Sequence, residues 1–219
     1  VQNEDSGWGD IAVSPDGKKW AFTAGGDVWA TTMEGDVPAT RVTMTPAAEG
    51  GILWAEDSEE IVYYSWRTGT PKLYAYDFTT NTERQVTSGE GRDQPGEFSP
   101  DGESLAYGRM VNEEMELRVI DWESGEDRRL AVDLEGGLTW SPDSRWIAYS
   151  RHLPNLMRAV FVFDLETMRS QQLTDGMSDA AYPVFDRSGK YLYFAASTDI
   201  GPRISWADLS GIDHVSTRN

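Results

Sequence analysis

The chain has no cysteine among its 219 residues. It can therefore form neither disulfide bonds nor thiolate metal sites, although this absence leaves the cellular compartment undecided. Only two histidines are present, so a histidine-based active site has two candidates for its base. No apolar run reaches the length of a membrane-spanning helix, and we expect no membrane insertion. The chain begins without methionine, and we expect it to be a piece of a larger protein.

Positive charge is also scarce. Nineteen Lys and Arg residues face 37 Asp and Glu residues, which gives a formal net charge of −18. Such a balance disfavours nucleic acid and anionic membrane surfaces as partners. Aromatic residues, in contrast, are plentiful for so polar a chain, with nine Trp, nine Tyr and seven Phe. Rings of this kind suit the pleated faces of sheets that stack on one another.

One phrase recurs along the chain in three clear copies and two degenerate ones, the latter at residues 54–58 and 184–189. An apolar stretch leads into a turn of the type Ser-Pro-Asp-Ser or Ser-Pro-Asp-Gly, and a second apolar stretch follows, most clearly at residues 140–149. Proline presets φ for a turn, and the Asp side chain can bond its own backbone, so each phrase predicts a strand, a tight turn and a strand. The equivalent turn positions are separated by 41, 44, 42 and 45 residues: Asp16, Asp57, Asp101, Asp143 and Ser188.

A period in the low forties that contains several short strands is typical of a β-propeller with one four-stranded blade per repeat. We therefore predict an all-β fold, a β-propeller of five four-stranded blades. It forms one domain over residues 1–219, with repeats at about 7–46, 47–90, 91–133, 134–177 and 178–217. The alternative is a two-sheet sandwich with coincidental spacing, which five copies of one turn phrase make a poor explanation.

Each repeat has room for four strands. The predicted first strands are 11–13, 52–54, 96–98, 138–140 and 183–185, and the second are 20–22, 61–64, 105–107, 147–149 and 191–194. The third are 27–30, 72–77, 116–121, 159–164 and 203–208. The fourth are the polar runs 41–43, 84–87, 128–130 and 171–174, and residues 209–217 supply the last turn and strand. Polar fourth strands suit an edge that must not pair with other chains.

The phrase Ser-Pro-Asp-Gly-Lys at residues 14–18, followed by Ala-Phe, resembles the propeller repeats of TolB, tricorn-type proteases and prolyl oligopeptidase relatives. Residues 172–202 are similar to the end of a propeller in bacterial tricorn-like serine peptidases. In that family two propellers precede a PDZ domain and a catalytic core. The resemblance implies a propeller that filters or channels peptides, with unfolded polypeptide and the catalytic and PDZ domains of the parent chain as partners. Family propellers carry six or seven blades, so a larger ring is the alternative to five.

Catalysis by this chain itself finds no support in its motifs. A serine hydrolase needs a nucleophile, a base and an orienting acid, and only His152 and His214 could be the base. There is no Gly-x-Ser-x-Gly elbow and no His-x-x-x-His or EF-hand pattern. By resemblance, the catalytic serine and histidine belong to a core domain, and no residue here matches their motifs. We predict no catalytic residue, no metal site and no cofactor.

Ligand binding has better support. Counting eight residues from the turn position reaches Arg109 and Arg151, and Arg67 lies two residues beyond the matching position of the second repeat. Because the arginine fork fits a carboxylate, we predict a site for a peptide carboxylate at Arg67, Arg109 and Arg151. The alternative is ion pairing between blades. The nearby loops supply charged residues for either outcome: Glu49, Arg92, Asp93, Asp133, Glu135 and Asp179.

These observations predict a non-catalytic propeller domain of a tricorn-like peptidase, which guides or selects peptides for a separate catalytic core. A TolB-like docking platform for a protein partner is the chief alternative. A small-molecule enzyme with a site in the central channel is the third, and it requires converging carboxylates on the first strands, where Glu97 stands alone. We favour a bacterial periplasmic or secreted location over a cytoplasmic one.

Overall fold

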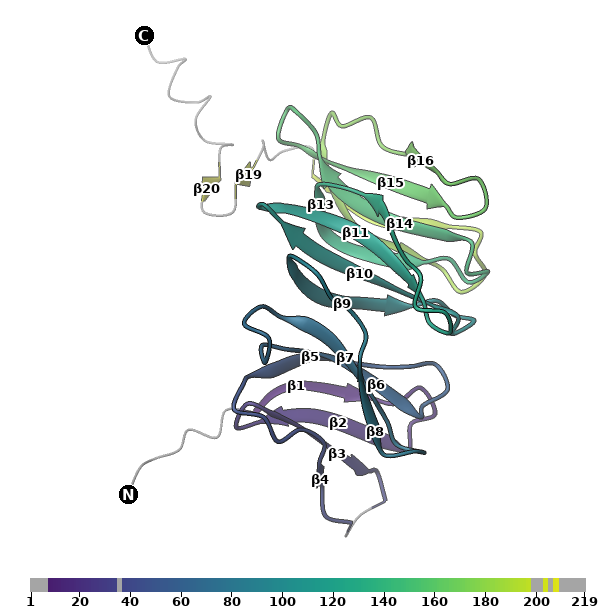
Figure 1. Ribbon diagram of the computed structural model, residues 1–219. Coiled ribbons are helices and arrows are strands. Elements are labelled where there is room, and N and C mark those ends of the chain that lie inside the picture. The colour runs from purple at the N-terminus through teal and green to yellow at the C-terminus, as the bar shows by residue number, and fades with distance from the viewer. Residues whose placement is uncertain (1–7, 35–36, 198–202, 205–206, 209–219) are drawn as a thin grey trace. The chain divides into compact units, whose positions relative to one another are not determined.

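The computed structural model describes residues 8–34, 37–197, 203–204 and 207–208. Every regular element within these residues is a β-strand (Figure 1), and none of the described residues belongs to a helix that could cross a membrane. The prediction of an all-β fold is confirmed. The chain divides into two compact units, the first with residues 1–98, 102–113 and 119–127 and the second with the rest. Each unit is described by itself.

Four sheets have four strands each, and in every one the strands pair in chain order. The first contains β1 (Trp8–Val13), β2 (Lys19–Ala24), β3 (Asp27–Thr32) and β4 (Thr40–Arg41). The second contains β5 (Glu49–Trp54), β6 (Glu60–Ser65), β7 (Lys72–Asp77) and β8 (Thr82–Gln85). The third contains β9 (Arg92–Phe98), β10 (Ser104–Val111), β11 (Glu114–Asp121) and β12 (Asp127–Ala131). The fourth contains β13 (Leu134–Trp140), β14 (Trp146–His152), β15 (Arg158–Asp164) and β16 (Arg169–Gln172).

The second strand of a sheet carries most of the core. In the second, third and fourth sheets three consecutive residues of this strand are fully buried: Ile61, Val62, Tyr63, Leu105, Ala106, Tyr107, Ile147, Ala148 and Tyr149. A strand with neighbours on both edges satisfies its backbone groups, so its side chains can be enclosed on both faces. The fourth strands lie at the sheet edge, and every residue of β4, β8 and β16 is exposed, as their polar sequences predict.

Within each unit, the first strand of one sheet covers a face of the sheet before it. In the first unit β5 contacts β1, β2 and β3, while Trp54 joins Ala21 and Val28 in one apolar cluster. The Trp54 indole also donates to the Ala12 carbonyl at 3.0 Å. β9 covers the second sheet in the same way and brings Phe98 into its core. In the second unit β17 (Asp179–Phe185) contacts β13, β14 and β15.

The turn phrase explains the tight reversals between first and second strands. The Asp16 carboxylate accepts from the Lys18 amide at 3.0 Å, which is the self-bonding predicted for this residue. The residue after the equivalent turn position has a positive φ in all five turns: Gly17, Ser58, Gly102, Ser144 and Gly189. Where this residue is serine, its hydroxyl accepts the backbone N–H of the Asp in the preceding turn. Ser58 accepts from Asp16, and Ser144 accepts from Asp101, each at 3.1 Å.

The fifth repeat differs from the prediction in its third strand. Among the described residues it has a two-stranded sheet of β17 and β18 (Leu192–Ser197), on which Tyr193 is 61% and Phe194 43% exposed. A single strand over 203–208 is wrong, because β19 (Arg203–Ile204) pairs with β20 (Ala207–Asp208). Residues 209–217 lie outside the described residues, and the count of five blades and the single domain stay predictions.

Candidate functional site

The three predicted arginines lie at one end of their second strands. Arg109 on β10 and Arg151 on β14 occupy equivalent positions, which Ser65 takes on β6, and Arg67 follows two residues later. The registers confirm this equivalence, because the position faces the first strand in each case. Its partners there are Glu49 for Ser65, Asp93 for Arg109 and Leu134 for Arg151.

Arg109 is buried and held by carboxylates of its own sheet. Its Nε and Nη2 donate to the two oxygens of Asp93 at 2.6 and 3.0 Å, and Nη1 lies 3.6 Å from Asp127. Asp93 is fully buried and also accepts from Thr87 at 2.6 Å and from Lys72 at 3.4 Å. Burial disfavours the charged guanidinium, but the hydrogen bond to Asp93 and the nearby charges together raise the pKa of Arg109 above its ordinary value.

Arg67 has the same kind of partner in the second sheet. Its two terminal nitrogens donate to Glu83 on β8 at 2.5 and 3.0 Å, and its Nε donates to Ser65 at 2.9 Å. The guanidinium also lies over the Tyr74 ring at 4.0 Å from the ring centre. Burial would raise the pKa of Glu83, but the hydrogen bonds from Arg67 and from the Tyr63 hydroxyl hold it below its usual value.

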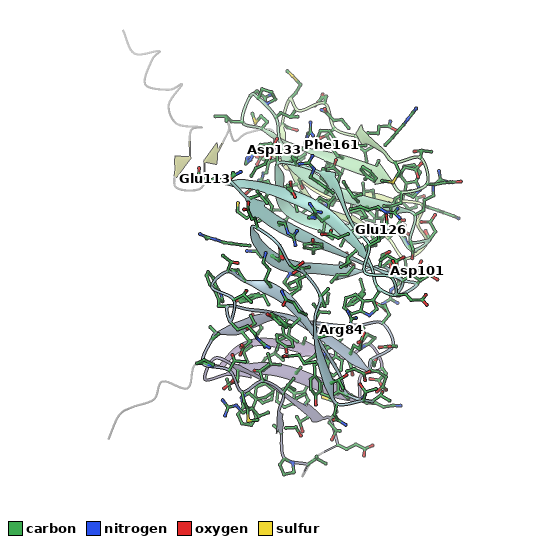
Figure 2. The ribbon with its side chains drawn as sticks, viewed as in Figure 1. Arg84, Asp101, Glu113, Glu126, Asp133 and Phe161 are labelled. Atoms are coloured by element: carbon green, nitrogen blue, oxygen red, sulfur yellow. The ribbon has the colours of Figure 1, made fainter. Side chains whose placement is uncertain are left out.

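Arg151 differs from both. Within the described part of the chain its side chain makes no hydrogen bond or ion pair, and its Nε is buried without a partner. Its guanidinium lies over the ring of Phe161 on β15, 4.4 Å from the ring centre; Figure 2 labels Phe161. The reason is local sequence. Leu134 lies on the first strand at the position where the second and third sheets have an acid. Ser170 lies on the fourth strand at the position of Glu83 in the second sheet and of Asp127 in the third.

The three arginines are therefore not equivalent. Arg67 and Arg109 form ion pairs, but with carboxylates of their own sheets rather than with those of a neighbouring blade. Both belong to the first compact unit, whereas Arg151 belongs to the second. A shared site for a peptide carboxylate at Arg67, Arg109 and Arg151 stays a prediction. Of the three, Arg151 is the one that pairs with no carboxylate among the described residues.

The charged residues of the neighbouring loops divide into two groups. Glu49, Asp93 and Asp179 are enclosed and already bonded, Glu49 to Thr43, Thr45 and Ser65. Arg92, Asp133 and Glu135 are exposed.

Two features of this end of the sheets escaped the sequence analysis. In the second, third and fourth sheets, the hydroxyl of a buried tyrosine on the second strand bonds the fourth strand: Tyr63 donates to Glu83, Tyr107 donates to Asp127 at 2.9 Å, and Tyr149 shares a hydrogen bond with Ser170 at 2.6 Å. The tyrosine recurs at a fixed place in three repeats, which is a signal that the sequence does carry. The second feature is an ion pair in which Arg158 Nε and Nη2 donate to Asp179 at 3.0 and 2.5 Å.

His152 shows no catalytic arrangement. His152 ends β14 and is half-buried, and no hydrogen bond from it to a hydroxyl is found among the described residues. His214 lies outside the described residues. No group of three or more possible metal ligands occurs in the part of the chain that the structure describes. A hollow of about 290 Å³ beside β5 and β9 is lined by Gly51, Tyr64 and Pro95 among others, without a carboxylate. The absence of catalysis, metal and cofactor stays a prediction.

The sheets, their order and the turn phrase can now be compared with known proteins. The family model described as the TolB beta propeller domain matches residues 8–157. The chain belongs to this family. Among curated proteins, tricorn protease homolog 1 of Streptomyces coelicolor is 27% identical over 125 residues, which cover 55% of this chain and 11% of that protein. The Tol-Pal system protein TolB of Anaeromyxobacter dehalogenans strain 2CP-1 is 30% identical over 102 residues, 45% of this chain and 22% of that protein.

Solved structures agree on the fold of this TolB-type propeller. The crystal structure of the tricorn protease matches with a TM-score of 0.72 and 19% identity, over 89% of this chain and 21% of that one. A putative TolB from Agrobacterium tumefaciens matches with a TM-score of 0.64 and 21% identity, over 89% of this chain and 72% of that one. The chain spans only 11–22% of the length of the curated relatives above. The structural matches show the propeller fold, and the predicted likeness to TolB and tricorn-type propellers is confirmed.

Proposed function

We propose that this TolB-type propeller is a non-catalytic domain of a tricorn-like peptidase, which binds unfolded polypeptide and guides or selects it for a separate catalytic core. The observation that carries the proposal is the match to tricorn protease homolog 1, which extends over 55% of this chain. That protein is a protease by name, and this chain corresponds to only 11% of it. The sheets described here would then serve the peptidase by holding polypeptide.

Two features of the chain support a binding role over a catalytic one. No nucleophile–base pair is formed by the described residues, in which His152 lacks a bonded hydroxyl. Buried apolar side chains of the second strands fill the space between neighbouring sheets, so the described residues leave no room for a substrate there. A propeller that contributes contacts to a substrate needs only groups at the ends of its strands, which is where the charged side chains gather.

A second candidate is a TolB-like docking platform for a folded protein. It is favoured by the 30% identity to TolB of Anaeromyxobacter dehalogenans over 45% of this chain. The two candidates differ in the state of the bound protein. A peptide guide should recognise unfolded chains, and a docking platform should recognise the surface of a folded partner.

Binding of one protein in two states separates these candidates. The purified chain is titrated with fluorescently labelled α-lactalbumin, either native or reduced and carboxamidomethylated, which keeps it unfolded without adding charge. Preferential binding of the unfolded form supports the peptide guide. Binding of neither form, in a chain shown to be folded by circular dichroism, contradicts it. Hydrolysis of the unfolded form that is lost in His152→Ala would contradict the non-catalytic assignment.

A further inference from the structure

Buried and half-buried arginines in this chain are almost always paired with a carboxylate. In the described residues five arginines are at least half-buried, and four of them lie within 2.8 Å of a carboxylate oxygen: Arg67, Arg109, Arg118 and Arg158. The fifth is Arg151, which has no carboxylate partner among those residues. Taking a guanidinium out of water without a counter-charge costs free energy, so this exception requires an explanation.

The internal repeat shows what is missing around Arg151. At the equivalent position Arg109 meets Asp93 from the first strand and Asp127 from the fourth. In the fourth sheet Leu134 and Ser170 occupy those two places. Both acids have been replaced by uncharged residues while the arginine is retained. The result is a preformed position for a carboxylate that the sheet itself does not fill.

The surroundings keep the charge of Arg151 available. The Phe161 ring lies 4.4 Å from its guanidinium carbon and fixes the side chain without neutralising it. The next residue along its strand is His152, which is half-buried and carries no carboxylate. Arg158, which faces His152 across the β14–β15 pair, is already bonded to Asp179. The exposed acids Asp133 and Glu135 lie beside Leu134, opposite Arg151, but neither forms an ion pair with it among the described residues.

We propose that Arg151 is a binding residue for a carboxylate carried by an extended polypeptide. This inference rests on the proposed function, which supplies the polypeptide, and it narrows the predicted three-arginine site to one residue. Because Nε is enclosed by the protein, the carboxylate binds end-on through Nη1 and Nη2, with the guanidinium held against Phe161. The carboxylate can be the C-terminus of the polypeptide or the side chain of an Asp or Glu.

The test uses a short labelled peptide of Gly, Ser and Ala with one central Glu and a free C-terminus. Fluorescence anisotropy gives its affinity for the wild type, for Arg151→Gln and for Arg169→Gln. Arg169 lies exposed on β16 of the same sheet, so its variant carries the same change in net charge. We expect Arg151→Gln to weaken binding by about tenfold or more, the range for a hydrogen bond between charged groups, and Arg169→Gln to leave it unchanged.

Two altered peptides distinguish the sources of the carboxylate. Amidation of the C-terminus removes one carboxylate, and Glu-to-Gln replacement in the peptide removes the other. If the wild-type protein binds the amidated peptide more weakly than the parent peptide, the terminal carboxylate is the one bound. If it binds the Glu-to-Gln peptide more weakly, the side-chain carboxylate is the one bound. Equal affinity for the parent peptide and for a peptide lacking both carboxylates overturns the proposal.

A second variant, Ser170→Asp, tests the same site without removing the arginine. It restores the fourth-strand acid found in the third sheet, where Asp127 accepts from Tyr107 and lies near Arg109. The new carboxylate should form an ion pair with the Arg151 guanidinium. This pair should raise the midpoint of urea unfolding and weaken peptide binding by about tenfold. Unchanged binding in both Ser170→Asp and Arg151→Gln overturns the proposal while leaving the proposed function intact. Failure of the wild type to bind any unfolded chain counts against the proposed function itself.

Discussion

Single side chains at the strand ends show how this acidic protein manages buried charge. Asp93 has no exposed surface, and it is satisfied by two nitrogens of Arg109, by the Thr87 hydroxyl and by Lys72. Arg84, labelled in Figure 2, is an exposed arginine that lies 3.6 Å from Glu60. Each pair joins an arginine to an acidic residue, so the sequence does not distinguish them. Their contributions to stability differ because of burial, since removal of one partner inside a protein leaves the other charge unpaired.

Replacement of Arg109 should therefore be costly. We expect Arg109→Gln to lower the free energy of unfolding by about 3–5 kcal/mol, because the buried Asp93 would lose its guanidinium partner and retain only Lys72 as a cation. The exposed control Arg84→Gln should cost at most about 1 kcal/mol. Urea denaturation followed by tryptophan fluorescence measures both. Equal effects of the two substitutions would show that the Arg109 pair is no more important than a surface pair.

Acid should weaken the pair between Arg158 and Asp179. The hydrogen bond from Arg158 holds the pKa of Asp179 below its ordinary value of about 4. The unfolded chain then binds a proton at this residue at a higher pH than the folded chain does. The contribution to stability is complete above the ordinary pKa and is lost as the pH falls towards the lowered one.

Urea midpoints measured between about pH 5 and pH 2 test this dependence. The urea midpoint of Asp179→Asn should fall less over that pH range than the midpoint of the wild type. The control Asp133→Asn changes an exposed carboxylate, so the same charge is removed without an ion pair. Parallel pH profiles for the wild type and Asp179→Asn would refute the assigned role of this carboxylate.

At the scale of the elements, the turns are the parts that sequence determines most directly. A positive φ at the same place of all five turns follows from the turn phrase, and Gly102 takes this conformation with a φ of 76°. A Cβ added there would meet only the Cβ of Glu56, at an ordinary 3.6 Å. The backbone conformation, and not a clash, is therefore what restricts this position.

The left-handed backbone at Gly102 predicts the result of two substitutions. Gly102→Ala should lower the free energy of unfolding by about 1–2 kcal/mol, the cost of a left-handed conformation for a residue with a Cβ. Gly102→Asn should cost less, because a short polar side chain can bond the local backbone in this conformation. Thermal unfolding by circular dichroism compares them with the wild type. A larger loss for Asn than for Ala would point to crowding instead of backbone strain.

The strands of the first four repeats could be predicted from the sequence because apolar runs and turns alternate with a fixed spacing. The side-chain pairs could not. Arg109 meets Asp93 and Asp127, which lie on opposite sides of it in the chain, and only the register of three strands brings them together. Arg109 and Arg151 therefore look equivalent by spacing, whereas the replacements at Leu134 and Ser170 become visible only when the strands are aligned. Residues 203–208 carry the third-strand pattern, but the pattern cannot say with which strand they pair.

The charge of the whole molecule sets its response to salt. With 37 acidic and 19 basic residues, the folded chain concentrates negative charge, and self-repulsion opposes the compact state. We expect the melting temperature to rise as sodium chloride is raised from about 0.01 M to 0.15 M, over which the screening length falls from about 30 to 8 Å. Differential scanning calorimetry measures this. A falling melting temperature would mean that the surface ion pairs outweigh the repulsion.

The alternation of Gly17, Ser58, Gly102, Ser144 and Gly189 in the turns has a consequence for how far repeated copies of a chain segment can differ. Serine in this conformation costs about 1 kcal/mol, and its hydroxyl recovers about the same by accepting a backbone N–H of the preceding turn. That N–H comes from the main chain, so it is offered whatever side chain the neighbour carries. Wherever a preceding turn offers this N–H, glycine and serine are therefore close to equivalent in stability at this position. Repeated copies can accordingly differ here without a compensating change elsewhere.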